Sequence, residues 1–347
     1  MAWNKASLAR LAKLAARLPK DPAGAISDAW RIYGRRGTIA LASALFSPLT
    51  LLSAVWLRAV RTYLDSGASR SLMRAAGTWP LLNHYYEPIS DPRQLPADYD
   101  EENQLPGIDL NAEGQLSLLR RFSFQPELSA LQVEASPTLG FYLANEMFSG
   151  ADAGFYYSLL RTCRPRRIVE IGSGFSTRLA VAAANRTREE DSAHACRITC
   201  IEPYENPWLQ QLPVELRREP LEATPDAIFD SLERNDILFI DSSHIIRPNG
   251  DVTRSFLRIL PRLKPGVFVH IHDIFTPWNY PRAWIESGRL WNEQQLLEAF
   301  LSLNAGYRVV AGLAYLCRRH PQQVLESLPC MKHDWSIGPS SFWIQRT

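Results

Sequence analysis

The stretch that decides the fold is Arg167-Ile-Val-Glu-Ile-Gly-Ser-Gly-Phe-Ser-Thr177. A β-branched run leads into a turn with two glycines, and this order predicts a buried strand, a tight turn and a helix. Such a turn lets backbone N–H groups approach a ligand closely. A dinucleotide fingerprint is excluded because Thr177 replaces its third glycine, and the sequence has no Gly-Lys-Ser/Thr phosphate loop. The pattern suits a ligand that carries an amino acid and a nucleoside.

Strand and helix patterns alternate from this stretch to the end of the chain. Seven strands are expected, at residues 168–171, 197–201, 218–221, 236–240, 267–271, 307–311 and 341–345. Helices are expected between several of them, at residues 177–185, 252–263 and 294–304. The last two strands are separated by a loop-rich stretch. The alternation predicts an α/β fold with a doubly wound, Rossmann-like seven-stranded sheet, mostly parallel with the last strand antiparallel.

The chain is expected to divide into three parts. Residues 1–64 form a basic, helical extension, residues 65–150 a proline-rich connector with cap helices, and residues 151–347 the α/β domain. Hydrophobic residues at 46% and charged residues at 21% are typical of a globular protein with a sizeable core. Before the first strand, helices are expected at residues 115–122, 139–148 and 152–163.

Charge and cysteine content limit which partners and which cellular setting are expected for the protein. The net charge is +2, but residues 1–62 hold ten basic and two acidic residues, so this end carries +8 and the remainder −6. No basic run interleaved with aromatic residues follows the strands, so a nucleic-acid partner is not expected. The five cysteines form no Cys-x-x-Cys pair, which favours a reduced, cytoplasmic setting and argues against a zinc site.

The basic N-terminal part makes a membrane surface a candidate partner. Residues 5–18 fit a basic amphipathic helix, which suits an anionic membrane surface, a transit peptide or a surface helix on the main domain. Residues 37–57 are uncharged and long enough to span a bilayer. Ser47-Pro48, however, is typical of a helix start, so two shorter helices are expected, at 39–46 and 48–64. Buried helices, peripheral or monotopic membrane contact and a true span all stay open.

Charged side chains stand where four of the expected strands end: Glu170, Glu202, Asp241 and His272-Asp273. Ligands of parallel α/β sheets bind outside the carboxyl ends of the strands, so we expect these side chains to share one site. A carboxylate at Glu202 could accept both hydroxyls of a ribose.

Four motifs resemble, in order, those of class I S-adenosylmethionine-dependent methyltransferases of the small-molecule type. They are Glu170-Ile-Gly-Ser-Gly-Phe-Ser-Thr177, Cys200-Ile-Glu-Pro203, Phe239-Ile-Asp-Ser-Ser-His244 and Leu263-Lys-Pro-Gly266, within a resemblance over about residues 150–347. The resemblance implies S-adenosylmethionine (SAM) as cofactor and an antiparallel hairpin at the end of the sheet. The cofactor-binding residues that it implies are Glu170, Gly172, Ser173 and Gly174 at the methionine part, Glu202 at the ribose and Asp241 nearby. Glu222 is the candidate for the adenine.

Methyl transfer to a hydroxyl requires close placement of the acceptor and removal of its proton. His272, His244 and Asp273 are the candidate catalytic residues, with a histidine as general base. His270 is expected inside the sheet layer as a hydrogen-bonded core residue. The alternative is a divalent cation held by Asp241 and Asp273, as in the branch that resembles catechol methyltransferases. Since Ile274 replaces the asparagine of that branch, no metal is the first expectation.

Two aromatic segments have open roles. Trp278, Tyr280 and Trp284 in the loop after the fifth strand could stack on an acceptor or pack on one another. Residues 84–88, His-Tyr-Tyr-Glu-Pro, could lie on the catalytic face or anchor the connector. The expected function is methyl transfer to a hydroxyl of a small molecule or glycan. A nucleotide-dependent oxidoreductase and a cofactor-binding scaffold without catalysis are the alternatives.

Overall fold

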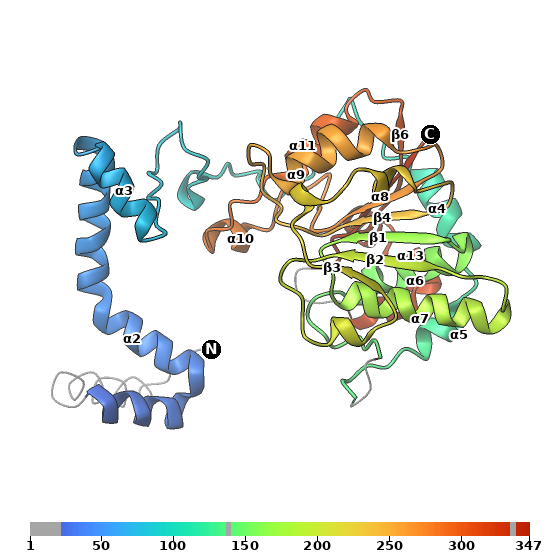
Figure 1. Cartoon of the computed structure of the whole chain (residues 1–347), viewed down its shortest axis with the longest axis horizontal. Helices are drawn as coiled ribbons and strands as arrows, with labels where there is room; N and C mark the ends of the chain where they lie inside the picture. The colour runs from blue at the N-terminus through green and yellow to red at the C-terminus, as the bar shows by residue number, and fades with distance from the viewer. Residues whose placement is uncertain (1–21, 137–139, 334–337) are drawn as a thin grey trace. The chain divides into compact units, whose positions relative to one another are not determined.

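The computed structural model describes residues 22–136, 140–333 and 338–347. The chain divides into two compact units, Met1–Ile89 and Ser90–Thr347, which are described separately (Figure 1). The helix expected at residues 5–18 lies outside the described residues. The expected division into three parts stays a prediction.

The larger unit is built on a seven-stranded sheet with the order β3-β2-β1-β4-β5-β7-β6. The strands are β1 (Arg167–Ile171), β2 (Arg197–Ile201), β3 (Glu215–Arg217), β4 (Ile237–Ile240), β5 (Phe268–Ile271), β6 (Tyr307–Gly312) and β7 (Phe342–Arg346). β7 runs antiparallel to both β5 and β6, and every other pair is parallel. The prediction of a Rossmann-like, mostly parallel sheet with an antiparallel last strand is confirmed.

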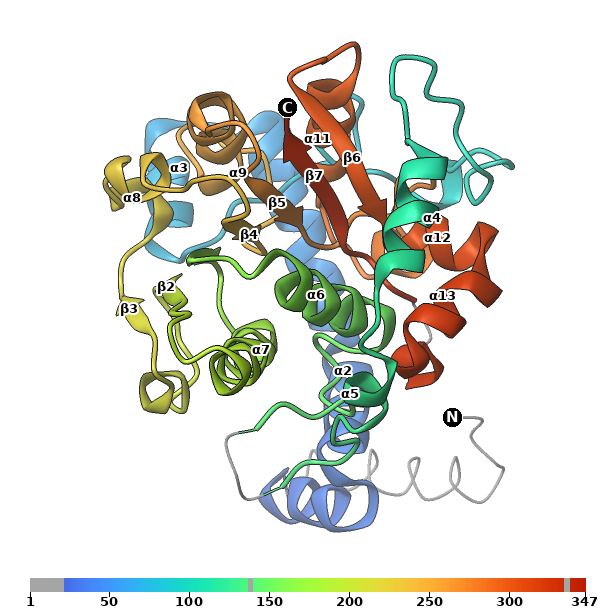
Figure 2. The same cartoon turned by 90° about the vertical axis from the view of Figure 1, so that its right-hand side faces the viewer.

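Helices cover both faces of this sheet (Figure 2). The α-helices of this unit are α4 (Ala112–Arg121), α5 (Gln125–Ser129), α6 (Gly150–Cys163), α7 (Phe175–Glu190), α8 (Ala227–Asp230), α9 (Asp251–Arg254), α10 (Arg282–Glu286), α11 (Glu293–Leu301), α12 (Leu313–Arg319) and α13 (Pro321–Ser327). α6 and α7 lie on one face, and α9 and α11 on the other. Alternation along β5 sends Phe268 into the first core and Val269 and Ile271 into the second. The first core includes Phe155, Tyr156 and Trp343, all fully buried.

Three expected elements of this unit are wrong, each because a local group overrides the pattern. The third strand lies at Glu215–Arg217 instead of 218–221, since Pro220 cannot donate to a strand ladder. Residues 140–148 form turns instead of a helix, because the Asn145 amide bonds four nearby backbone groups. The stretch between the last two strands is not loop-rich: it holds α12 and α13, and Pro321 occupies the first turn of α13.

The helix expected at 252–263 is interrupted. α9 gives way to a π-helical turn at Ser255–Ile259 and a 3-10 turn at Leu260–Arg262. Pro261 lies in that last turn, where its missing N–H and fixed ring are incompatible with a continuing α-helix.

The smaller unit contains α2 (Pro22–Tyr63) and α3 (Gly67–Ala75). The expected break at Ser47-Pro48 is wrong, because α2 continues through Pro48. Proline leaves the carbonyl of Ala44 without its usual N–H partner, but the Ser47 hydroxyl donates to that carbonyl at 2.8 Å. Among the described residues, none of the helices has the length and apolar character needed to cross a membrane.

The aromatic residues of the connector contact one another. The rings of His84, Tyr85 and Tyr86 have centroids 4.0 to 5.5 Å apart. Both tyrosines are largely exposed.

Candidate active site

A cleft of about 540 Å³ lies at the carboxyl ends of β1, β2 and β4. Its lining includes four residues that the sequence singled out: Gly172, Glu202, Glu222 and Asp241. Of the charged residues expected at the strand ends, Glu202 and Asp241 line this cleft together, as the carboxyl ends of parallel strands allow. Apolar lining comes from the strands themselves, through Ile171 and Ile201.

The two glycines of the turn differ in how much space a side chain would have. Gly172 has φ +79°, and a Cβ atom there would lie 1.7 Å from the carbonyl oxygen of Asp241. A side chain at Gly172 is thus incompatible with the junction of β1 and β4. A Cβ atom at Gly174 would meet nothing within 4 Å. The bare backbone at Gly174 borders open space in which a ligand can approach the turn.

Glu170 supports this turn from beneath. Its carboxylate is fully buried and accepts a hydrogen bond from the Thr177 hydroxyl at 2.5 Å. The same hydroxyl accepts from the Gly174 N–H at 3.1 Å, so the acid holds the turn through one intermediary. Burial raises the pKa of Glu170 to about 7, because a charged carboxylate in this environment lacks water. Glu170 is not among the residues that line the cleft.

Glu202 is fixed in position by the backbone around it. One carboxylate oxygen accepts from the Ser173 N–H at 3.1 Å, and the other from the Tyr204 N–H at 2.8 Å. A carboxylate oxygen has capacity for a second acceptor bond, so both can still receive a hydroxyl from a ligand. Ser173 thereby serves the site through its N–H, which aims Glu202 into the cleft.

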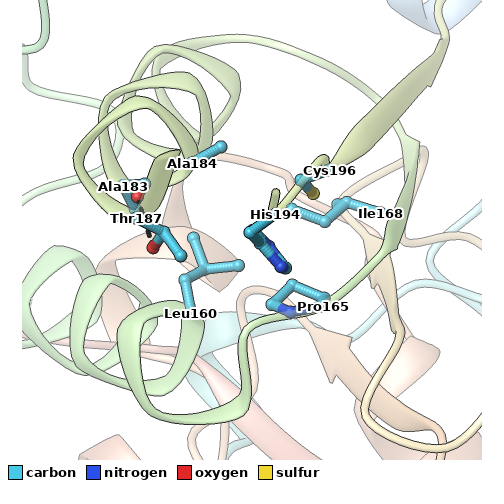
Figure 3. Close-up of a pocket in the computed structure, with 8 residues that line it drawn as sticks. All are labelled: Leu160, Pro165, Ile168, Ala183, Ala184, Thr187, His194 and Cys196. Atoms are coloured by element: carbon cyan, nitrogen blue, oxygen red, sulfur yellow. Dashed lines mark hydrogen bonds between the residues drawn. The ribbon is translucent and has the colours of Figure 1, made fainter. Parts of the chain in front are cut away.

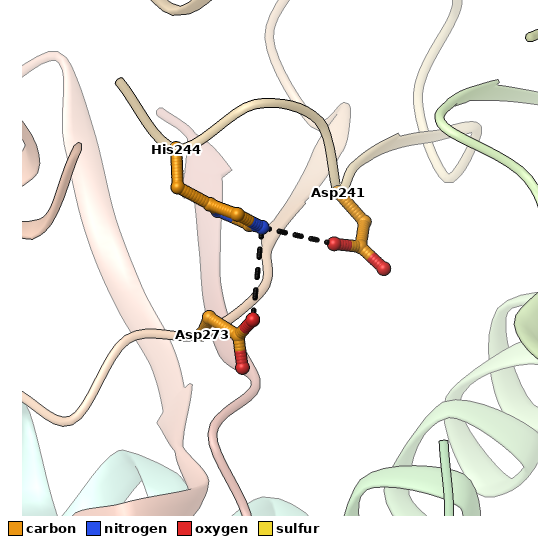
Figure 4. A group of neighbouring side chains, drawn as sticks. All are labelled: Asp241, His244 and Asp273. Atoms are coloured by element: carbon orange, nitrogen blue, oxygen red, sulfur yellow. Dashed lines mark ion pairs between the residues drawn. The ribbon is translucent and has the colours of Figure 1, made fainter. Parts of the chain in front are cut away.

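A second group of side chains adjoins the cleft through Asp241 (Figure 4). The Nε2 atom of His244 lies 3.3 Å from Asp241 Oδ1 and 3.6 Å from Asp273 Oδ2. The other ring nitrogen, Nδ1, lies 2.9 Å from Oε2 of the fully buried Glu293. The sequence identified Asp241, His244 and Asp273, but not Glu293. Glu293 begins a helix rather than ending a strand, so the strand-end pattern could not find it.

The backbone at this group is held in an unusual conformation. His244 has φ +58° and Asp273 has φ +55°, values that residues with a side chain rarely adopt. Left-handed backbone at such residues costs about 1 kcal/mol or more and persists only where the surroundings hold it. The N–H groups of Asn292 and Glu293 both donate to the His244 carbonyl, at 3.0 and 3.2 Å. In this conformation, the His244 ring faces both Asp241 and Asp273.

The charges of this group favour a protonated imidazole in the absence of other ligands. Burial lowers the pKa of His244, but hydrogen bonds and charges from Asp241 and Glu293 outweigh it and raise that pKa to about 10. Burial raises the pKa of Glu293, and the histidine beside it only partly offsets this effect. His244 alone is therefore a poor proton acceptor at neutral pH.

His272 lies next to this group. Its ring is buried, Nε2 is 4.0 Å from Asp273 Oδ1, and Nδ1 has no hydrogen-bond partner among the described residues. Burial lowers the pKa of His272, but the charges of Asp241, Asp273 and Asp152 raise it further, so the net direction is upward. Asp152, which the sequence did not identify, is buried at the start of α6 and accepts the N–H groups of Ser340 and Ser341.

His270 is a core residue, as expected. It is fully buried, its Nε2 lies 2.9 Å from the Ser341 hydroxyl, and its ring stacks on Phe239 with centroids 3.8 Å apart. Burial and the neighbouring histidines hold its pKa well below the usual range.

The aromatic loop packs on itself. Trp278, Tyr280 and Trp284 are buried, and Tyr280 stacks on Trp284 with ring centroids 6.0 Å apart. Of the two roles left open by the sequence, mutual packing is the one the geometry supports. The aromatic ring beside the charged group is instead Trp291, 4.3 Å from the His244 ring.

A second, smaller hollow lies between α6, α7 and the start of β1 (Figure 3). It is lined mainly by small and apolar side chains, including Leu160, Ile168 and Ala183, and has a volume of about 10 Å³. A volume of that size holds about one water molecule, so this hollow is not a ligand site.

Known proteins match the part of the chain that builds the site. Residues 169–274 match a family model described as a methyltransferase domain. An uncharacterized protein of Archaeoglobus fulgidus is 30% identical over 167 residues, which make up 44% of this chain and 74% of that protein.

Solved structures resemble the chain more weakly. The O-methyltransferase TomG from Streptomyces achromogenes, in complex with SAM, is 14% identical with a TM-score of 0.34, over 75% of this chain and 99% of that chain. The O-methyltransferase from Bacillus cereus, in complex with SAH, is 12% identical with a TM-score of 0.33, over 67% of this chain and 91% of that chain. Cofactor-bound Rv0187 from MTB is 13% identical with a TM-score of 0.33, over 74% and 97%. All three TM-scores are below 0.5, so no activity is carried over from these structures.

The domain match begins in β1, covers the glycine turn, Glu202 and Asp241, and ends just after Asp273. It thus spans the strand ends that the four sequence motifs mark. Residues 169–274 therefore form a methyltransferase domain, and the chain resembles the class I S-adenosylmethionine-dependent methyltransferases.

Proposed function

We propose that the protein binds SAM and transfers its methyl group to a hydroxyl oxygen of a small molecule or glycan. The observation that carries this proposal is the cleft of about 540 Å³, which joins the glycine turn, Glu202 and Glu222 to Asp241 at one sheet edge. The amino acid, the ribose and the base of SAM each need different surroundings, and the residues along this cleft provide them one after another. When bound, the cofactor supplies an electrophilic methyl group on a sulfonium.

The residues of the cleft have separable roles in this proposal. The open backbone at Gly174 receives the methionine part, and the carboxylate of Glu202, aimed by the Ser173 N–H, accepts the ribose hydroxyls. Glu222 borders the base. Glu170 contributes indirectly, because it holds the turn through Thr177.

His272 is the residue that we propose as general base. Both ring nitrogens of His244 already face carboxylates, whereas Nδ1 of His272 is free of partners among the described residues. The charges of Asp241, Asp273 and Asp152 stabilise the ring of His272 once it has taken a proton.

Two variants test the proposal in different ways. His272→Gln should bind SAM as the unaltered protein does, while transfer falls by about 100-fold or more. Glu202→Gln should weaken SAM binding itself. Binding is measured by calorimetry, and transfer by mass spectrometry of a metabolite and glycan extract incubated with SAM labelled on its methyl group. Binding of NADH in place of SAM would favour the oxidoreductase alternative, and SAM binding without any labelled product would favour the scaffold.

A further inference from the structure

A pocket lies at the opposite ends of the strands from the cleft. Its lining includes Asn235, just before β4, Phe268 at the start of β5, and residues of α4, α6, β6 and β7. The volume is about 460 Å³, and ligand pockets in proteins span about 300 to 1,000 Å³. None of its lining residues lines the cleft, so this is a separate candidate site.

Three arginines from separate elements line this pocket, which we call the arginine pocket, and no acidic residue is among its lining. Arg121 ends α4, Arg234 precedes β4, and Arg308 lies on β6. Among the described residues, the side chains of Arg121 and Arg234 form no ion pair and no hydrogen bond, and that of Arg308 bonds only the neutral Gln345. By contrast, arginines elsewhere on this unit, such as Arg262, have carboxylate partners.

The thiol in the lining of the arginine pocket brings no negative charge. Burial raises the pKa of Cys163 to about 12, and the charge of Arg121 only partly offsets this effect. The thiol is therefore protonated at neutral pH. Three positive charges thus border one pocket without a counter-charge from its lining, and such charges attract an anion from solution.

Two of the guanidinium groups are positioned by one backbone turn. Arg308 donates from Nε and Nη2 to Gln345 Oε1, at 3.1 and 2.5 Å, and the Gln345 amide donates to the Gly266 carbonyl at 3.1 Å. Arg234 lies over the same glycine, since a Cβ atom at Gly266 would lie 3.2 Å from the Arg234 Cζ atom. Side chains that are positioned before binding lose less conformational freedom when a ligand arrives.

We infer that the arginine pocket binds a small molecule that carries phosphate groups. A guanidinium donates two parallel N–H bonds to two phosphate oxygens. A phosphate ester carries a charge of about −1.5 to −2 at neutral pH and three acceptor oxygens, so it complements three arginines better than a single carboxylate does. Apolar lining from Leu118 and Phe268 suits the organic part of such a molecule. The inference goes beyond the proposed function, because it concerns neither SAM nor the methyl acceptor.

Anion binding can be measured on the full chain by calorimetry with inorganic pyrophosphate, at low ionic strength and in a buffer free of phosphate. We expect one pyrophosphate to bind. Arg121→Gln and Arg308→Gln should each lower the affinity about tenfold or more, as expected for loss of a charged hydrogen bond. Arg262→Gln is the matched control, because it removes the same charge from an arginine that is already paired with Asp230. This control should keep the affinity of the unaltered protein.

Two further measurements need no substitution. Hydrogen exchange should slow at residues 117–121 and 232–236 when pyrophosphate is added, and it should not change at the glycine turn. Citrate, which offers carboxylates, should bind more weakly than pyrophosphate. Absence of pyrophosphate binding, full affinity of both arginine variants, or protection at the glycine turn instead would overturn the inference. Citrate binding as tight as that of pyrophosphate would overturn the assignment to phosphate.

A different observation, in the smaller unit, indicates a lipid partner. Within residues 46–56 of α2, six large apolar side chains are each more than half exposed: Phe46, Leu49, Leu51, Leu52, Val55 and Trp56. At 100° per residue they cover a broad arc of the helix, while Ser43, Ser47, Thr50 and Arg58 share the remaining arc. Contiguous exposed apolar surface of this kind marks an interaction site.

We propose that this arc of α2 inserts into the surface of an anionic lipid bilayer. Charge selects this occupant, because residues 1–62 carry a net charge of +8 and a bilayer with anionic headgroups is complementary to it. Trp56 is the residue type that favours the boundary between headgroups and acyl chains.

Vesicle binding tests this surface. The full chain should sediment with vesicles of phosphatidylcholine and phosphatidylglycerol at low salt, and much less with phosphatidylcholine alone. A Leu52→Ser/Trp56→Ser double variant, which leaves the charge unchanged, should bind at least about tenfold more weakly, because it loses apolar surface that the bilayer would bury. Ser43→Ala/Thr50→Ala, on the polar arc, is the matched control and should bind as the unaltered chain does.

Failure of the unaltered chain to bind the anionic vesicles would overturn the lipid proposal, as would equal binding of the Leu52→Ser/Trp56→Ser variant. Light scattering gives the oligomeric state of the same samples. A dimer that this variant abolishes, without vesicle binding by the unaltered chain, would assign the surface to a second copy and overturn the proposal.

Discussion

A Cβ atom at residue 172 would lie 1.7 Å from the carbonyl oxygen of Asp241, so the glycine turn and the end of β4 touch through their backbones. The Asp241 N–H also donates to the Ile171 carbonyl at 2.8 Å. The backbone contact between β1 and β4 therefore positions two features at once. One is the part of the cleft that would receive the cofactor, and the other is the acidic group beside it.

Alanine substitutions should separate the two glycines of the turn. Gly172→Ala should destabilise the protein by at least about 2 kcal/mol, because it combines a positive φ with a backbone clash. Gly174→Ala should fold with little change, since its methyl group would meet nothing within 4 Å, and under the proposed function it should lose SAM affinity. Urea unfolding and calorimetry measure the two effects. Equal stability of both variants would contradict this account of the junction.

Glu170 should make stability depend on pH. Its pKa is about 7 when folded and 4.5 ordinarily, so the folded state holds the proton more tightly. As pH rises from 4.5 to 7 the unfolded chain loses this proton first, and the folded state loses up to about 3 kcal/mol relative to lower pH. Glu170→Gln removes this penalty, so it should be more stable than the unaltered protein at pH 8. The difference should shrink toward pH 5 in urea unfolding, and a difference that does not change with pH would refute the assignment.

Arg161 should be a stability residue away from the site. Its buried guanidinium bonds Glu127 at 3.0 Å, Glu190 at 2.6 Å and Thr187 at 2.9 Å, and so joins α5, α6 and α7. Arg161→Ala should cost about 2 kcal/mol, below the usual figure for a fully buried pair because both acids are partly exposed. Lys264→Ala, at an exposed pair with Glu233, is the control and should cost less than about 0.5 kcal/mol in the same unfolding assay.

Glu202 should contribute to binding of the adenosine part of SAM and not of its methionine part. Glu202→Gln replaces one acceptor oxygen by an NH₂ group, so the Kd for adenosine and for SAM should rise about 10- to 100-fold, as for loss of a charged hydrogen bond. Methionine binding should not change, because it does not involve this residue. Calorimetry with the three ligands measures this, and an unchanged Kd for adenosine would place the ribose elsewhere.

Local sequence pattern was sufficient for the sheet apart from its third strand, and for the charged residues at the strand ends. Glu170, Glu202, Asp241 and Asp273 each follow or close an apolar run, and the parallel order brings such ends together. Glu293 and Asp152 could not be found in this way, because each reaches the site from a helix start that only the tertiary fold brings near.

Predictions from local sequence were also wrong where a side chain supplied a hydrogen bond that the backbone could not make. Ser47-Pro48 reads as a helix start, yet the serine hydroxyl satisfies the carbonyl that the proline leaves free, and α2 continues. At Asn145 the opposite occurs, because a side-chain amide replaces the bonds a helix would have made. Whether such a side chain continues a helix or replaces it depends on the positions of its hydrogen-bond partners, which residue propensities do not describe.

The position of β7 between β5 and β6 has a consequence for how the protein forms during synthesis. β6 has no strand partner in the described sheet other than β7, and β5 faces β7 across an antiparallel pairing. Until residues 342–346 have left the ribosome, one side of the nascent sheet has an open edge and β6 is unpaired. Pairing between segments so far apart in the chain is slow, and exposed strand edges invite aggregation. A chaperone that shields the edge of β5 would therefore act on this protein until residues 342–346 are available to pair with it.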